Sequence, residues 1–204
     1  MRTIRGRSND PAAKLSRTPW SWGASAAERA DRYACDGLSA PQDVRLLRAV
    51  SVDAAPEAVW SWLGNLRVAP YSYDWADNLG RRSPRRLRSD LPPLAVGQRV
   101  MTIFTAEHVE PGSDLSLRLH QGPGLALFGQ VRVTYAVRPD GDGSRLVAVL
   151  RLAGGGGPLG SLRRTLLAWG DLLMMRKQLL TLRDLAEGRW DPHRPSRRRS
   201  RRRR

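Results

Sequence analysis

The sequence predicts an α+β fold in which a meander of antiparallel strands curves around one long helix at the end of the chain. Successive segments between residues 97 and 152 have strand-like alternation and are separated by short turns rich in glycine, proline and aspartate. That order is typical of consecutive antiparallel strands with one covered face. A leucine-rich segment without proline then runs from residue 159 to 187, which is typical of a helix.

Positive charge is concentrated at the two ends of the chain. The net charge is +16 over 204 residues, and residues 188–204 alone contain nine arginines and one aspartate. Residues 1–17 add five basic residues and one acidic residue. We therefore predict a mostly disordered segment over residues 1–43 with room for one short helix at residues 25–34, one domain over residues 44–188, and a disordered arginine-rich tail over residues 189–204.

The single cysteine and the absence of long apolar runs suggest where the protein works. Cys35 alone excludes an internal disulfide and fits a reducing compartment. The first residues contain no apolar stretch of the kind that secretory signals have. The longest apolar run is interrupted by Asp171 and is far shorter than a membrane span. We expect a soluble cytoplasmic protein without a membrane span.

The first strand and helix follow from local signals. Residues 45–53 are rich in β-branched residues and partly alternate, which predicts a strand. Asp53 can cap a helix, Pro56 suits the first helical turn, and Glu57 lies at the positive end of the helix dipole. A short helix is therefore predicted to follow the first strand directly.

The remaining strands and the last helix are predicted from periodicity. The predicted strands cover residues 97–109, 114–121, 130–138 and 144–152. A glycine-rich stretch over residues 154–160 then predicts a flexible hinge. One apolar stripe of the last helix consists of Leu162, Leu166, Trp169, Leu173 and Leu180. A neighbouring stripe consists of Leu172, Met175, Leu179 and Leu182. Together they predict a broad apolar arc that faces the sheet.

Three segments carry a resemblance to a known family. They read VDAAPEAVW at residues 52–60, VGQRVMTIF at residues 96–104, and LLMMRKQLLTLRDLAE at residues 172–187. With the order of elements, they make residues 45–187 resemble the START-like helix-grip superfamily, the SRPBCC type, which includes polyketide cyclases and plant pollen allergens. The resemblance implies a curved sheet wrapped around the last helix, short helices after the first strand, and a cavity between sheet and helix.

The resemblance also bounds the function. Members bind lipids, hormones or polyketides in the cavity, and a minority catalyse cyclisation or dehydration. The superfamily has no shared catalytic set, so no catalytic residue can be carried over to this chain. Fold likeness alone does not decide function.

The connector over residues 70–84 has the composition of a mixed ligand site. Its aromatic side chains combine an apolar body with a polar tip, and its carboxylate and amide groups can orient a hydroxyl or carbonyl. The predicted ligand contacts in it are Tyr71, Tyr73, Asp74, Trp75 and Asn78. The alternative is a polar corner in which Asp74 and Asn78 only cap turns.

Two strand residues are further candidates. Phe104 and His108 share one face of a predicted strand. If that face is concave, the imidazole of His108 points into the cavity and is available for acid–base chemistry. The alternative is a histidine whose hydrogen bonds are satisfied within the core. Tyr135 and Met175 are expected to supply apolar wall.

The last helix contributes two more candidates, Trp169 and Arg176. Arg176 falls within the predicted apolar arc, and a buried arginine is costly unless it is paired. Its partner would be Glu107, Asp74 or a ligand; the alternatives are a structural ion pair or a side chain that reaches out to solvent. Asp171 falls on the opposite side and is expected to pair on the surface.

Three functions remain open at this point. The first is binding of a small, partly apolar or amphipathic ligand between the sheet and the last helix. The second is a cyclase or dehydratase in the same cavity, with His108 or Asp74 as the acid–base group. The third is an adaptor that binds nucleic acid or an acidic partner through the arginine-rich tail. The alternative is a solvated tail that makes only non-specific contacts. The three dispersed histidines and one cysteine have no metal-ligand spacing, so no metal or other cofactor is predicted.

Overall fold

The computed structural model describes residues 18–73, 83–88, 90–120, 129–153 and 157–189. Three residues of the predicted connector site, Asp74, Trp75 and Asn78, lie outside the described residues. So does the predicted tail after Arg189.

The strands in the described ranges form one seven-stranded sheet in the order β1-β2-β7-β6-β5-β4-β3. β1 pairs in parallel with β2, and every other neighbouring pair is antiparallel. The strands are β1 Ser21–Trp22, β2 Val44–Val52, β3 Arg99–Val100, β4 Phe104–Glu110, β5 Asp114–Leu119, β6 Val131–Asp140 and β7 Gly143–Leu152. The predicted meander is therefore confirmed.

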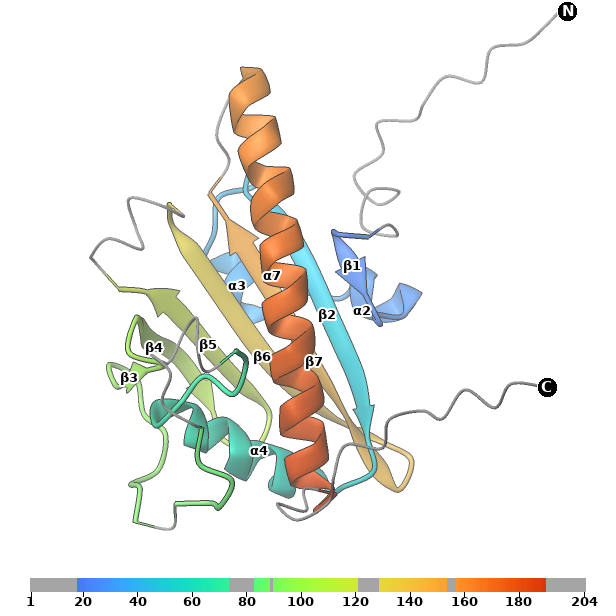
Figure 1. Cartoon of the computed structure of the whole chain (residues 1–204), viewed down its shortest axis with the longest axis vertical. Coiled ribbons are helices and arrows are strands. Elements are labelled where there is room, and N and C mark those ends of the chain that lie inside the picture. Colours follow the sequence, from blue (N-terminus) through green and yellow to red (C-terminus); the bar gives the residue numbers. More distant parts are fainter. Residues whose placement is uncertain (1–17, 74–82, 89, 121–128, 154–156, 190–204) are drawn as a thin grey trace, which may run out of the picture.

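The helices occupy the two faces and one end of this sheet. They are α2 Ala26–Ala30, α3 Ala34–Gly37, α4 Pro56–Gly64, the 3-10 helix η1 Asn65–Arg67, and α7 Gly157–Ala186. α7 lies diagonally across one face of the sheet, which we call the inner face. α4 contacts α7 near the C-terminal end of α7 (Figure 1). Strand, short helices, meander and long closing helix make this a helix-grip α+β fold, as predicted.

The main core lies between the inner face of the sheet and α7. The α7 members of that core are Ala168, Met175, Leu179, Leu182 and Leu185. Against them pack alternate residues of the strands, such as Leu46 and Val50 of β2 and Leu115 and Leu117 of β5. Alternation along each strand places these side chains on one face, because successive side chains point to opposite sides of a sheet.

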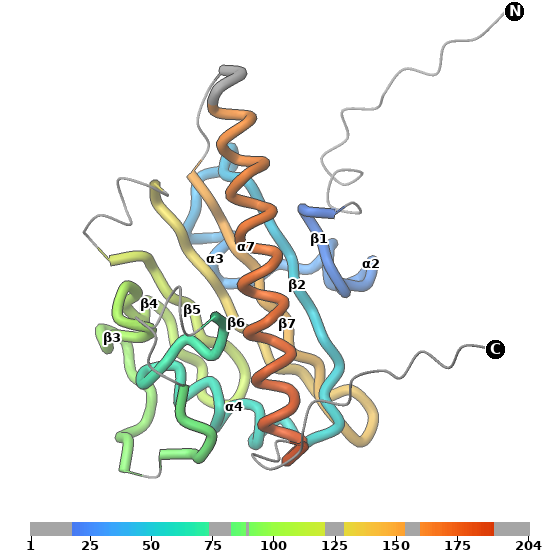
Figure 2. The backbone as a smooth tube through the Cα atoms, viewed as in Figure 1, coloured from blue at the N-terminus to red at the C-terminus, as the bar shows by residue number. Residues whose placement is uncertain are grey.

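The N-terminal segment differs from the prediction. Residues 18–43 lie within the span predicted to be mostly disordered, yet they form β1, α2 and α3 and extend the sheet beside β2 (Figure 2). The buried side chains of Tyr33 and Cys35 pack against Leu47 and Val149 on the outer face of the sheet. The Cys35 backbone N–H donates to Thr134 Oγ1 at 3.0 Å. The folded unit therefore begins well before residue 44.

Ion pairs explain why this segment holds its place. Arg45 donates to Asp36 at 3.1 Å, and Arg145 donates to Glu28 at 2.6 Å. Arg151 lies 3.7 Å from the same Asp36 carboxylate. The arginines belong to β2 and β7 and the acids belong to the N-terminal segment, so opposite charges join the two parts.

Gly143 marks a point where β7 passes close to β2. A Cβ atom at this position would lie 2.5 Å from the carbonyl oxygen of Val52, so alanine requires the two backbones to separate. We expect Gly143→Ala to lower the free energy of unfolding by about 1–3 kcal/mol. Gly170→Ala is the matched control, because an added Cβ there meets no atom within 4 Å. In a helix that change should stabilise by up to about 1 kcal/mol.

Chemical denaturation measures both effects. Equal stability of Gly143→Ala and the wild type would show that the close approach of β7 to β2 is absent in solution.

Candidate functional site

The rotation of α7 about its axis decides which side chains face the sheet. The predicted stripe of Leu172, Met175, Leu179 and Leu182 is buried, as expected. The other predicted stripe is largely wrong, because four of its members are exposed and only Leu180 is partly buried against the core. Those four exposed residues are Leu162, Leu166, Trp169 and Leu173.

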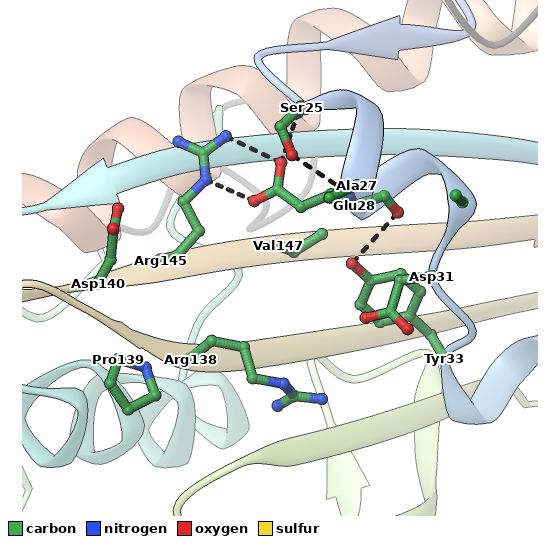
Figure 3. Close-up of a pocket in the computed structure, with 11 residues that line it drawn as sticks. Ser25, Ala27, Glu28, Asp31, Tyr33, Arg138, Pro139, Asp140, Arg145 and Val147 are labelled. Carbon is green, nitrogen blue, oxygen red and sulfur yellow. Dashed lines mark hydrogen bonds and ion pairs between the residues drawn. The ribbon is translucent and has the colours of Figure 1, made fainter.

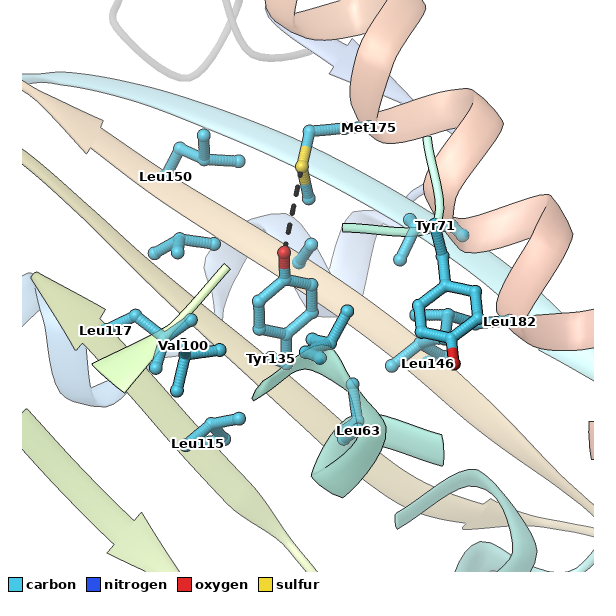
Figure 4. Close-up of a cluster of buried hydrophobic side chains, with 14 of the residues drawn as sticks. Leu63, Tyr71, Val100, Leu115, Leu117, Tyr135, Leu146, Leu150, Met175 and Leu182 are labelled. Carbon is cyan, nitrogen blue, oxygen red and sulfur yellow. Dashed lines mark hydrogen bonds between the residues drawn. The ribbon is translucent and has the colours of Figure 1, made fainter. Parts of the chain in front are cut away.

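The buried face of α7 carries the polar side chain of Gln178 in the middle of the main core. Gln178 is 3% exposed. Its Oε1 accepts a hydrogen bond of 2.6 Å from the Tyr135 hydroxyl, and its Nε2 donates to the Pro70 carbonyl at 2.5 Å. Tyr135 projects from β6 toward α7 and also contacts the sulfur of Met175 at 3.9 Å, as Figure 4 shows. A sheet strand, the long helix and the connector after η1 therefore meet at one amide.

The backbone around this pair has unusual conformations. Tyr71, which follows Pro70, has φ 56°, and Met101 and Thr102 have φ 50° and 65°. Residues other than glycine rarely adopt this region, and such conformations cluster at functional sites. Gln178 Nε2 lies 3.3 Å from the sulfur of Met101, so both unusual segments converge on this amide.

A buried ion pair lies next to the Tyr135–Gln178 pair. Arg48 is fully buried on the inner face of β2, and its Nη2 lies 2.8 Å from Asp171 Oδ2 on α7. The same guanidinium donates to the carbonyls of Trp20, Leu47 and Ala168. Its Nε has no hydrogen-bond partner among the described residues. The expectation that Asp171 pairs on the surface is therefore wrong.

Strand register brings the two pairs together. Arg48 is opposite Ala148 on β7, and Ala148 is opposite Tyr135 on β6. Asp171 and Gln178 are seven residues apart, two turns of α7. We call Arg48, Asp171, Tyr135 and Gln178 the buried polar row. It crosses the sheet beneath α7, with the small side chain of Ala148 at its centre.

Burial shifts the ionisation of this row. It raises the pKa of the Asp171 carboxyl to about 6, although the Arg48 guanidinium acts in the opposite direction. Burial also raises the pKa of Tyr135, and the nearby Asp171 charge adds to that rise. The tyrosine therefore remains a hydroxyl donor at neutral pH, whereas Asp171 is able to exchange a proton near neutrality.

The described part of the connector contains two predicted ligand residues. Tyr71 is buried, and its hydroxyl accepts a hydrogen bond of 3.0 Å from Asn65 Nδ2. Its ring packs edge-on against Trp62, with centroids 5.9 Å apart. Tyr73 is 36% exposed. The two tyrosines of the predicted site are therefore separated, because Tyr71 lies in the core and Tyr73 lies at the surface.

A β-bulge separates the two strand candidates. Phe104 packs against the main core, but the register of β4 against β5 shifts between Ala106 and His108. After the shift His108 is opposite Ser116, whose hydroxyl bonds Thr134 on the outer face of the sheet. The expectation that His108 shares the inner face is therefore wrong, because one extra residue reverses the alternation.

The two remaining candidates are on the solvent side of α7. Trp169 is 47% exposed. Arg176 is also exposed and lies over the ring of Trp22, with 5.3 Å from its guanidinium carbon to the ring centroid. Its expected partner Glu107 instead pairs with Arg132 at 2.8 Å. Arg176 therefore does not face an interior cavity.

A pocket of about 900 Å³ opens on the outer face instead. It lies between α2 and strands β6 and β7, and Figure 3 shows the ion pair of Arg145 with Glu28 inside it. Arg138, also in its lining, pairs with Asp114 at 2.7 Å. These charged groups already bind one another, so they are poorly placed to select a ligand.

Sequence reasoning missed the buried polar row. The signals were present, because Arg48 alternates with Leu46 and Val50 on one strand face. Gln178 likewise falls among Met175, Leu179 and Leu182 on one helix face. A polar residue within an apolar face is the pattern that identifies such positions.

Comparisons with known proteins concern the fold. No protein-family model and no curated protein matches the chain. A solved protein from Arthrobacter aurescens is similar at 11% identity and TM-score 0.48, and the similarity covers 74% of this chain and 92% of that protein. KanY is similar at 17% identity and TM-score 0.47, and the similarity covers 72% of this chain and 99% of KanY. StfQ, a di-domain ARO/CYC protein of the steffimycin biosynthetic pathway, is similar at 18% identity and TM-score 0.44, with 72% of this chain and 52% of StfQ covered.

The element order and the sheet topology define a helix-grip fold, with the buried polar row beneath the closing helix. Among the described residues, no group of three or more histidine, cysteine, aspartate or glutamate side chains is arranged to hold a metal ion. No helix within the described ranges is long and apolar enough to cross a membrane.

Proposed function

We propose that the protein binds a small, partly apolar molecule between α7 and the inner face of the sheet, at the buried polar row. The observation that carries this proposal is the Tyr135–Gln178 hydrogen bond, which lies among the apolar side chains of the main core and next to the Arg48–Asp171 pair. Small-molecule sites combine apolar walls with a few placed polar groups. A hydroxyl donor and an amide at this position match one hydroxyl or carbonyl on an apolar body.

Binding requires side chains to move, because the residues beneath α7 are packed against one another. Met175 and Met101 touch the two partners of the hydrogen bond, Tyr135 and Gln178. Methionine is unbranched and adapts easily to a new neighbour. We propose that the ligand displaces these two side chains and takes over hydrogen bonds of Gln178.

Binding of 2-naphthol, an apolar ring system with one hydroxyl, tests the proposal by fluorescence titration. Gln178→Leu is expected to weaken binding about tenfold, because loss of one buried hydrogen bond corresponds to roughly 1.4 kcal/mol. Gln130→Leu is the matched control, since Gln130 is exposed and directly precedes β6. Equal affinity of Gln178→Leu and the wild type would refute the proposal.

Acid–base catalysis in the same place is the second candidate, and Asp171 favours it. Its pKa is raised to about 6, so it can exchange a proton near neutral pH. A cyclase or dehydratase would therefore use Asp171 rather than His108, which is on the outer face. Dehydration of a β-hydroxyketone probe should then titrate near pH 6 and be lost in Asp171→Asn. Turnover that survives this change would exclude Asp171 as the acid–base group, and no turnover by the wild type would exclude the enzyme.

The third candidate uses the arginine-rich tail, which lies outside the described residues beyond Arg189. It stays a prediction. Loss of all nucleic-acid association on removal of residues 190–204, measured at two salt concentrations, would support it.

A further inference from the structure

The solvent side of α7 carries a continuous apolar stripe. Leu162, Leu166, Trp169 and Leu173 expose 59%, 63%, 47% and 57% of their surface. We call these four residues the outer stripe. They recur every three or four positions, so they align along one side of the helix. Contiguous exposed apolar surface of this kind marks an interaction site.

The flanks of the outer stripe are basic. Arg163, Arg176 and Lys177 are exposed beside it. The only acidic residue between residues 157 and 183 is Asp171, and its carboxylate points inward to Arg48. Arg176 is held close to the stripe by its position over the Trp22 ring. The surface that a partner meets is therefore apolar along its middle and positive at its edges.

This charge pattern argues against a second copy of the chain as the occupant. Antiparallel pairing centred on Trp169 and Gly170 would bring Arg163 of one copy opposite Arg176 of the other. Parallel pairing would oppose each arginine to its own equivalent. Like charges close together across an interface are unfavourable, so the complementary occupant is anionic.

The shape of this face favours a membrane surface over an acidic protein. In the view of Figure 1, α7 lies in front of the sheet, and the residues of the outer stripe are exposed. A protein partner would need a groove that matches this side of the helix, whereas a bilayer interface adapts to it. Helices with an apolar side and lysine or arginine at its edges lie in the plane of such an interface. The net charge of +16 adds attraction to an anionic leaflet.

We propose that the protein docks on an anionic phospholipid surface through the outer stripe of α7. The three leucines enter the boundary between headgroups and acyl chains, and Trp169 lies at headgroup level, where its amphipathic ring is favoured. Arg176 and Lys177 contact lipid phosphates at the two edges. The helix lies on the membrane and does not span it, because its opposite face remains in the core.

Co-sedimentation of the full chain with vesicles tests this proposal. One set of vesicles contains equal parts of phosphatidylglycerol and phosphatidylcholine, and the other contains phosphatidylcholine alone. The Leu166→Gln/Leu173→Gln variant keeps every charge and is expected to bind the anionic vesicles at least tenfold more weakly than the wild type. The matched control is Val96→Gln/Ile103→Gln, which changes two exposed apolar residues elsewhere and should bind as the wild type does.

Several results would overturn the proposal. Equal binding of the outer-stripe variant and the wild type would show that charge alone attracts the chain to vesicles. Equal binding of the wild type to both kinds of vesicle, or no binding to either, would show that the protein does not recognise an anionic surface. A wild-type dimer that dissociates in the variant, seen by analytical ultracentrifugation, would identify a second copy as the occupant. Far-UV circular dichroism and the Tm of each variant verify that it is folded, and Leu162→Gln/Leu166→Gln provides a second variant of the stripe.

Discussion

Replacing Asp171 with leucine is expected to lower the free energy of unfolding by about 3–5 kcal/mol. The change leaves the Arg48 guanidinium fully buried and without its counter-ion. An arginine side chain does not lose its proton in proteins, so it cannot escape this cost by becoming neutral. Chemical denaturation followed by circular dichroism measures the loss.

Two further variants separate the ion pair from simple packing. Arg48→Met should cost less than Asp171→Leu, because the buried Asp171 carboxyl can take up a proton once its partner is gone. The double variant Arg48→Met/Asp171→Leu should recover most of the stability, since replacing a whole buried pair with apolar groups is often neutral. A double variant as unstable as the sum of the two single variants would show that the pair is not formed.

The same carboxyl predicts a pH dependence. Its pKa is raised to about 6 in the folded protein from an ordinary value of 3.8, so the folded state binds this proton more tightly. The resulting stability is fully present below about pH 4 and is lost as the pH rises to about 6. The stability of the wild type relative to Asp171→Asn should therefore fall across this interval. A relative stability that rises instead would contradict the environment described for Asp171.

Cys35 is expected to react with thiol reagents at least about a hundredfold more slowly in the native protein than in denaturant. Its side chain is fully buried, and burial raises the pKa of the thiol to about 11 from an ordinary value of 9.0. At pH 8 that shift alone lowers the reactive thiolate fraction about a hundredfold. The rate of labelling by a disulfide reagent measures the effect.

Asp36→Ala provides the matched comparison for Cys35. It removes the carboxylate shared by Arg45 and Arg151, so the N-terminal segment should open more often and Cys35 should react faster. Labelling of native Cys35 as fast as that of an unfolded thiol would show that residues 18–43 are not packed on the outer face.

Much of the fold was predictable because periodicity and turn residues act locally. The alternation in β5 and β6 and the helix over α7 needed no knowledge of distant partners. The packing of the N-terminal segment on the sheet was missed because the apolar content of this segment is small. Its place depends on arginines of β2 and β7 that lie far away in the sequence, such as Arg145 with Glu28.

The candidate site was harder to predict for two physical reasons. α7 has apolar residues on two sides, and composition alone does not show whether Trp169 or Met175 faces the sheet. Leu172 and Leu179 were placed correctly, but the error for Trp169 also misplaced Asp171 and Arg176. In β4, a bulge that the alternation of the sequence does not indicate places His108 on the outer face.

A crystal structure with 2-naphthol bound shows whether a ligand binds at the Tyr135–Gln178 pair. We expect the naphthol hydroxyl within hydrogen-bond distance of Gln178, with the side chain of Met175 displaced from the Tyr135 hydroxyl. Naphthol in the outer pocket beside Glu28 and Arg145, with the Tyr135–Gln178 hydrogen bond intact, would contradict it.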